Sequence, residues 1–140
     1  MAINPKNAEA HNNLGAVLLQ KGELDEAISH YQQALEINPQ DIRARGNLAW
    51  ALATSPQTPI HKAVAVKLAE QANQLSGGEN PAVLHILAAA YAQNGEFSDA
   101  IDTADRALQL AVAQENSVLA DSLRAEIEFY RNGLPYRFGK

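Results

Sequence analysis

The sequence predicts an all-α protein of one domain, residues 1–140, made of three antiparallel helix pairs followed by a capping helix. The first observation is a repeat, because INPKN at residues 3–7 returns as INPQD at residues 37–41, thirty-four positions later. The second is spacing: apolar and small residues recur at steps of three and four, which places them on one face of a helix. The third is composition, since 140 residues with 46% hydrophobic content can bury the core of a folded domain.

The first helix pair is expected within residues 8–41. In its first helix, Leu14, Val17 and Leu18 share one face. Gly22 can end this helix, because glycine readily adopts the left-handed backbone conformation that closes a helix C-terminus. Small residues on both helices should let them approach closely. The facing stripe of the second helix consists of Ala27, Ile28, Tyr31, Ala34 and Leu35.

The second pair, expected within residues 42–80, departs from the regular pattern. Its first helix keeps the register, because Asn-Leu-Ala at residues 47–49 matches Asn-Leu-Gly at residues 13–15. Its second helix fits only after a four-residue insertion in the segment SPQTP, which predicts a longer loop around Ser55–Pro59. The residues that then match are Ala65, Ala69, Ala72 and Leu75.

The third pair is expected within residues 81–114, and one more amphipathic helix within residues 117–131. A terminal helix of this kind covers the apolar edge that the last repeat of a stacked array exposes. Tyr136 and Phe138, in the tail of residues 132–140, either pack back on this cap or stay disordered. The apolar side of the capping helix consists of Leu119, Leu123 and Ile127. Candidate N-caps of other helices are Asp41, Thr58 and Asn80.

Small and large residues recur in a fixed order in the first and third units. The matching residues are Leu14, Gly15, Gly22, Ala27, Tyr31, Ala34 and Pro39 in the first unit, and Leu87, Ala88, Tyr91, Gly95, Ala100 and Ala107 in the third. This order resembles the tetratricopeptide repeat (TPR) family over nearly all of residues 1–114. The resemblance implies a right-handed α-solenoid. Residues 1–7 then resemble the tail of a preceding repeat, so the chain is expected to be a fragment of a longer array.

The resemblance also implies a concave groove, lined by the first helix of each pair, that binds a protein partner. The residues expected to line it are Asn13, Ala16, Gln20, Asn47, Trp50, Thr54, Ile86, Ala89 and Gln93. Asn13 and Asn47 resemble the asparagine ladder of the O-linked N-acetylglucosamine transferase repeats, where amides hold the backbone of an extended peptide. Ile86 interrupts this ladder in the third unit. Alternatively, the two asparagines only bond neighbouring helices.

Trp50 is the only tryptophan in the chain and is expected on the groove side of its helix. Two interpretations stay open for it. A large aromatic side chain with an indole N–H among amides is typical of an interface anchor. The ring could equally lie across a neighbouring helix and fill space there.

Co-chaperone members of the TPR family hold a C-terminal carboxylate with two asparagines and several cations. Asn13 and Asn47 match the asparagine positions. Glu9, Ala82 and Ile86, however, stand where the resemblance requires cations. A carboxylate would meet repulsion from Glu9 and no bidentate partner, so this function is not expected.

Composition and motifs argue against other classes of function. Eleven basic against sixteen acidic residues offer no basic stripe for nucleic acid, and no apolar run is long enough for membrane insertion. The absence of cysteine fits a reducing compartment such as the cytoplasm. No catalytic, cofactor or metal-ligand motif occurs. The acidic row Asp99, Asp102 and Asp105 is interpreted as a solvated face, and the histidines His11, His30, His61 and His85 as surface or groove residues.

The expected function is therefore that of a non-catalytic scaffold, without cofactor or metal, that binds an extended peptide or a partner helix. The alternative is a structural or oligomerising C-terminal segment of a larger enzyme. NLAWALATSP and FYRNGLPYR resemble repeat segments of large bacterial proteins, some with a membrane glycosyltransferase-like part. A homodimer through the first helix pair is also predicted, because Val17 and part of Leu14 would lack a covering neighbour.

Overall fold

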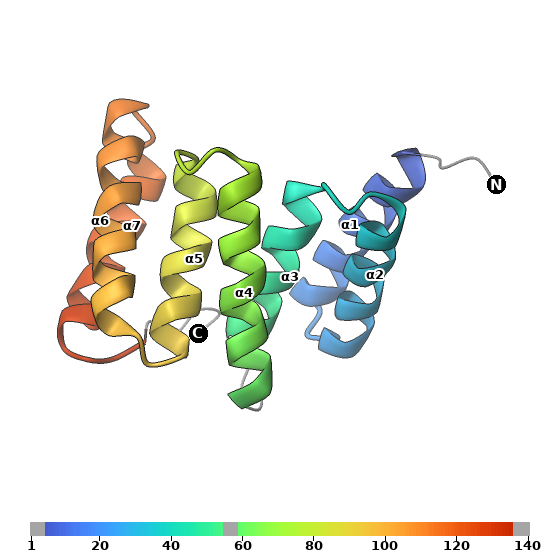
Figure 1. Cartoon of the computed structure of the whole chain (residues 1–140), viewed down its shortest axis with the longest axis horizontal. Helices are drawn as coiled ribbons and strands as arrows, with labels where there is room; N and C mark the ends of the chain where they lie inside the picture. The colour runs from blue at the N-terminus through green and yellow to red at the C-terminus, as the bar shows by residue number, and fades with distance from the viewer. Residues whose placement is uncertain (1–4, 55–58, 136–140) are drawn as a thin grey trace.

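A computed structural model describes residues 5–54 and 59–135, and within them it contains seven α-helices and no strand (Figure 1). The helices are α1 (Pro5–Gln20), α2 (Leu24–Ile37), α3 (Ile42–Thr54), α4 (Pro59–Leu75), α5 (Pro81–Gln93), α6 (Phe97–Ala113) and α7 (Ser117–Arg131). The all-α prediction of three helix pairs and a terminal helix is confirmed.

Successive helices form pairs that stack side by side, with α1 at one end of the array and α7 at the other (Figure 1). Besides its own pair partner, each odd-numbered helix contacts the next odd-numbered one, from α1 to α3, α5 and α7. In the described residues α2 makes no contact with α4, and α4 makes none with α6. The odd-numbered helices are therefore crowded on the inner side of a curved array, so their free surface is the concave one.

Small residues let the paired helices approach. Gly15 of α1 lies against the ring of Tyr31 in α2, so closely that a Cβ atom at Gly15 would be 2.7 Å from Cε1 of Tyr31. Alanines fill most of the remaining helix contacts with no exposed surface, among them Ala27, Ala49 and Ala100. The close approach excludes water from the helix interfaces and leaves few gaps.

Turns and caps follow the expected chemistry. Gly22 and Gly95 follow α1 and α5 with φ of +80° and +81°, the left-handed conformation that closes a helix end. The side chain of Asn80 accepts hydrogen bonds from the first turn of α5, and Oδ1 of Asp41 accepts one from the backbone N–H of Ala44. Thr58, the third candidate cap, lies outside the described residues.

Helix α4 begins earlier than its counterpart in the first pair, in the region of the four-residue insertion. Ala65 of α4 is the counterpart of Ala27 in α2, so the counterpart of Leu24, where α2 begins, is Lys62. Helix α4 begins three residues earlier, at Pro59. A proline at the first helical position costs little, because the N–H it lacks would have no helical partner. The helix thus begins at the residue where the sequence predicted the end of the loop, and residues 55–58 lie outside the description.

The apolar side chains at the two ends of the array are buried to different extents. At the C-terminal end, α7 buries Leu123 and Ile127 and half-buries Leu119 against the preceding helices, as predicted for a cap. At the other end, α1 begins at Pro5, earlier than the repeat unit expected from residue 8. Its side chains Leu14 and Val17 are 44% and 47% exposed, which confirms the predicted lack of cover. Tyr136 and Phe138 lie outside the described residues.

Candidate functional site: the concave surface of the odd-numbered helices

The predicted groove residues differ in how much surface they offer. Asn13 and Gln20 of α1 are exposed, whereas Ala16, Asn47, Trp50, Ile86 and Gln93 are half-buried. Ala89 is fully buried. It therefore contributes close helix packing under the groove and no surface of its own. The side chain of Thr54 lies outside the described part of the chain.

Asn47 joins α3 to α1 through a residue that the sequence analysis did not single out. Its amide Nδ2 donates a hydrogen bond of 2.9 Å to Oδ1 of Asn12. Asn12 is only 1% exposed, and an amide buried this deeply requires a partner. The neighbour Asn13 remains on the exposed side of the helix. Asn47 thus has a structural bond to α1, while its own carbonyl oxygen makes no hydrogen bond within the described residues.

A cation lies in the same part of the groove. Nη2 of Arg43, in the first turn of α3, donates a hydrogen bond of 3.2 Å to Oδ1 of Asn13. This contact uses the amide oxygen of Asn13, and its NH2 group makes no hydrogen bond in the described residues. Arg43 was not expected in the groove, although it lies four residues before Asn47 and therefore on the same helix face.

Side-chain contacts link α3, α5 and α7 along the groove, toward the C-terminal end of the array. The rings of Trp50 in α3 and His85 in α5 have centroids 5.2 Å apart and are tilted by 54°. His85 in turn bonds α7, with Nε2 at 2.7 Å and 3.0 Å from the two carboxylate oxygens of Glu126. Glu126 is 2% exposed. Three of the odd-numbered helices are therefore linked through side chains at the groove.

The hydroxyl of Tyr130 lies 3.4 Å from Oε1 of Glu126 and donates toward it. Burial, and then the nearby Glu126 carboxylate, raise the pKa of Tyr130 well above its ordinary value. The phenol therefore stays protonated and acts as a donor over the whole physiological pH range. Helical spacing could have indicated this buried acid, because Glu126 lies three residues after Leu123 and four before Tyr130, on the packing side of α7.

Two comparisons support the identity of the fold. Models of the tetratricopeptide repeat match residues 8–41 and residues 83–118, which together make up half of the chain. The chain belongs to the tetratricopeptide repeat family. Among solved structures, a TPR domain described as the first TPR of Spaghetti (RPAP3) bound to HSP90 peptide SRMEEVD superposes with a TM-score of 0.69. It is 20% identical, and the match covers 87% of this chain and 97% of that one. A search of curated proteins returned no significant match.

In this TPR chain the first helix pair also contains an unexpected pair of histidines. Nδ1 of His11 in α1 lies 2.9 Å from Nδ1 of His30 in α2. One ring must donate and the other accept, so a single proton lies between them. No signal in the sequence indicates this pairing, because the two histidines are nineteen residues apart and meet only when α1 packs against α2. No group of three or more metal-ligating side chains occurs in the described residues.

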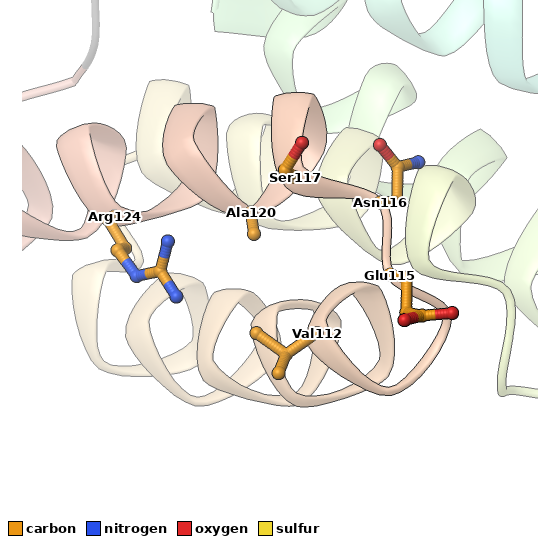
Figure 2. A pocket seen from close by; sticks show the side chains of 6 residues that line it. All are labelled: Val112, Glu115, Asn116, Ser117, Ala120 and Arg124. Atoms are coloured by element: carbon orange, nitrogen blue, oxygen red, sulfur yellow. The ribbon is translucent and has the colours of Figure 1, made fainter.

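The pocket drawn in Figure 2 lies away from the groove, between α6 and α7 at the end of the TPR array. Val112 of α6 faces Ala120 and Arg124 of α7 across a space of about 270 Å³, and Glu115 lies at one end (Figure 2). None of the predicted groove residues lines it. Asp99 and Asp102 are exposed and Asp105 half-buried on α6, in line with the predicted solvated face. None of the described helices is both long and apolar enough to cross a membrane.

Proposed function

We propose that the chain is a non-catalytic interaction module that binds an extended segment of a protein partner along the concave groove. The observation that carries the proposal is the pair of amides on neighbouring helices. Asn13 is exposed with its NH2 group unbonded, and Asn47 keeps an unbonded carbonyl oxygen, within the described residues. One donor and one acceptor side by side match the C=O and N–H of a peptide backbone.

The similar TPR domain of Spaghetti (RPAP3) is described as bound to an HSP90 peptide. This similarity supports a peptide as the kind of partner, but it does not identify the peptide that this chain binds. Arg43 adds one positive charge beside the two amides. Further along, Trp50 and Ile86 offer half-buried apolar surface. The groove should therefore prefer a segment that makes backbone contacts near α1 and α3 and places an apolar side chain near α5.

A displayed peptide library can test the groove without a known ligand. Peptides selected on the immobilised chain should lose at least tenfold in affinity for Asn13→Ala/Asn47→Ala, because each amide contributes a hydrogen bond of about 1 kcal/mol. Lys67→Ala, an exposed change on α4, is the matched control and should bind as the wild type does. Selected peptides that bind the double variant as tightly as the wild type would exclude the groove as the binding site.

A second candidate function is self-association through the first helix pair. It is favoured by the exposed apolar side chains Leu14 and Val17, which lie together on α1. Apolar patches of this kind commonly mark a contact with another chain. In that case the array serves as an oligomerising segment, and peptide binding by the groove is not required.

A further inference from the structure

Arg45 lines a second pocket, on another side of α3 from the groove. The pocket has a volume of about 400 Å³ and is lined by Pro39, Gln40, Arg45, Gln71, Gln74 and Leu75. It is formed by the turn between α2 and α3 and the last turns of α4. Arg45 follows Arg43 by two residues, and side chains two apart on a helix project about 200° apart. The pocket is therefore separate from the proposed peptide groove.

The guanidinium of Arg45 is held in place by neutral groups. Its Nη1 donates to Oε1 of Gln71 at 2.5 Å, and its Nη2 donates to the carbonyl oxygen of Pro39 at 2.7 Å. Its Nε is buried and has no hydrogen-bond partner among the described residues. A guanidinium has five N–H donors, so three remain unsatisfied by the described protein groups.

In the part of the chain that the structure describes, no carboxylate forms an ion pair with Arg45. Within residues 5–54 and 59–135, the ion pairs of the other arginines involve Arg106, Arg124 and Arg131, and none involves Arg45. The nearest acidic residue in sequence, Asp41, uses Oδ1 to cap α3 at the backbone N–H of Ala44. The other polar side chains of the pocket, Gln40, Gln71 and Gln74, are uncharged amides. The chain has a net charge of −5, so acidic residues outnumber basic ones. A half-buried arginine that pairs with none of the described carboxylates is therefore unexpected.

We propose that this pocket binds a carboxylate, supplied by an acidic side chain of a protein partner. The planar guanidinium is preorganised by Gln71 and Pro39, and Nη1 and Nη2 each keep one N–H, which match the two oxygens of a carboxylate. The neighbouring glutamine amides can donate further hydrogen bonds, while Pro39 and Leu75 provide apolar walls for the methylene groups of the acidic side chain. One guanidinium among neutral groups balances one negative charge, which favours a carboxylate over a doubly charged phosphate.

The test is an NMR titration of the arginine Nε–H signals of the intact chain, with the Arg45 signal assigned through Arg45→Lys. N-acetylglutamate N-methylamide should shift the Arg45 signal in a saturable way, with half-saturation on the order of 10 mM. N-acetylglutamine N-methylamide has nearly the same shape without the charge and should leave the signal in place. Gln74→Ala, which changes the pocket but no bond of Arg45, should raise the half-saturation concentration at least threefold.

The signals of two other arginines serve as internal controls. Arg106 already pairs with Glu79 at 2.6 Å and should shift little. A saturable shift confined to Arg43 would place the carboxylate in the groove and overturn the proposal for Arg45. Equal shifts with the glutamate and glutamine derivatives would also overturn it, as would tighter binding of inorganic phosphate than of the glutamate derivative. None of these outcomes depends on whether the groove binds a peptide.

Discussion

His85 and Glu126, forty-one residues apart in the sequence, form a bond that ties the capping helix to the third repeat: Nε2 of His85 lies 2.7 Å from Oε1 of Glu126. The carboxylate is almost completely buried and the imidazole side chain is 17% exposed. Burying a carboxylate is costly unless it is hydrogen-bonded, so the bond determines whether α7 can pack as it does.

His85→Ala should lower the free energy of unfolding by about 3 kcal/mol, because Glu126 would remain buried and, among the described residues, would keep just the Tyr130 hydroxyl at 3.4 Å as a partner. The double variant His85→Ala/Glu126→Gln should be more stable than His85→Ala, since a neutral amide is less costly to bury. Urea unfolding followed by circular dichroism measures both. Equal stability of the single and double variants would show that Glu126 carries no buried charge.

Alkaline pH should destabilise the chain through two buried tyrosines, Tyr31 and Tyr130, and the half-buried Tyr91. Burial raises the pKa of Tyr31, Tyr91 and Tyr130 above the ordinary value of 10.0. Because the neutral phenol is favoured in the folded state, this stabilising contribution is fully present below about pH 10. It is lost as the pH rises above that value. Unfolding free energies measured from pH 7 to pH 11 should be flat up to about pH 10 and then fall.

Tyr130→Phe is the control for this pH effect, because it removes the ionisable group and keeps the ring. It should lose about 1 kcal/mol at pH 7 through the missing hydrogen bond to Glu126. Its stability should then decline less steeply than that of the wild type above pH 10. An identical alkaline slope would mean that Tyr130 does not contribute to the effect.

Gly15→Ala should lower the free energy of unfolding by about 1–3 kcal/mol, because the new methyl group would lie 2.7 Å from the ring of Tyr31. Gly46→Ala is the matched change. Its methyl group would meet only the terminal Cδ1 of Ile86 at 3.3 Å, and alanine favours a helix over glycine by about 1 kcal/mol. It should be neutral or stabilising. Thermal unfolding that ranks the two variants in the reverse order would contradict the close contact of α1 and α2.

Trp50→Ala should weaken binding of a groove-selected peptide by about 2 kcal/mol, the magnitude typical of an interface hot spot. Thermal stability should change little, because Trp50 is only half-buried, whereas a fully buried tryptophan would cost about 3–5 kcal/mol. Calorimetric titration and thermal unfolding of the same samples separate the two effects. A clear loss of stability with unchanged affinity would identify Trp50 as a packing residue that supports His85.

If the chain self-associates through α1, Val17→Lys should abolish the dimer, because a charge would replace exposed apolar surface at the contact. Val118→Lys is the control at the other end of the array, where Val118 of α7 is 79% exposed. It should leave the dimer intact. Sedimentation equilibrium distinguishes these cases. A wild-type chain that remains monomeric at high concentration would argue against the dimer, as would a dimer that Val118→Lys dissociates.

Much of the fold could be predicted because it depends on contacts close in sequence. The thirty-four-residue repeat, the periodic alanines and the glycines after α1 and α5 report local helix and turn geometry, which each segment determines largely by itself. The groove could be predicted only in outline. Asn13 and Asn47 were expected there, and the structure shows both on neighbouring odd-numbered helices. Arg43 was missed because single polar residues on a helix surface carry no distinctive pattern.

The sequence by itself thus determined the helices, their pairing and the order in which they stack. All three follow from the thirty-four-residue repeat, because each repeat unit forms one helix pair and consecutive units stack on one another. Only the tertiary structure decided which polar residues meet. Asn12 with Asn47, His11 with His30, and His85 with Glu126 come from different helices. The residues of each pair come together only after the helices have packed at a particular angle and register. Apolar periodicity fixes which face is buried, but one polar side chain on that face needs a partner whose position depends on the whole array.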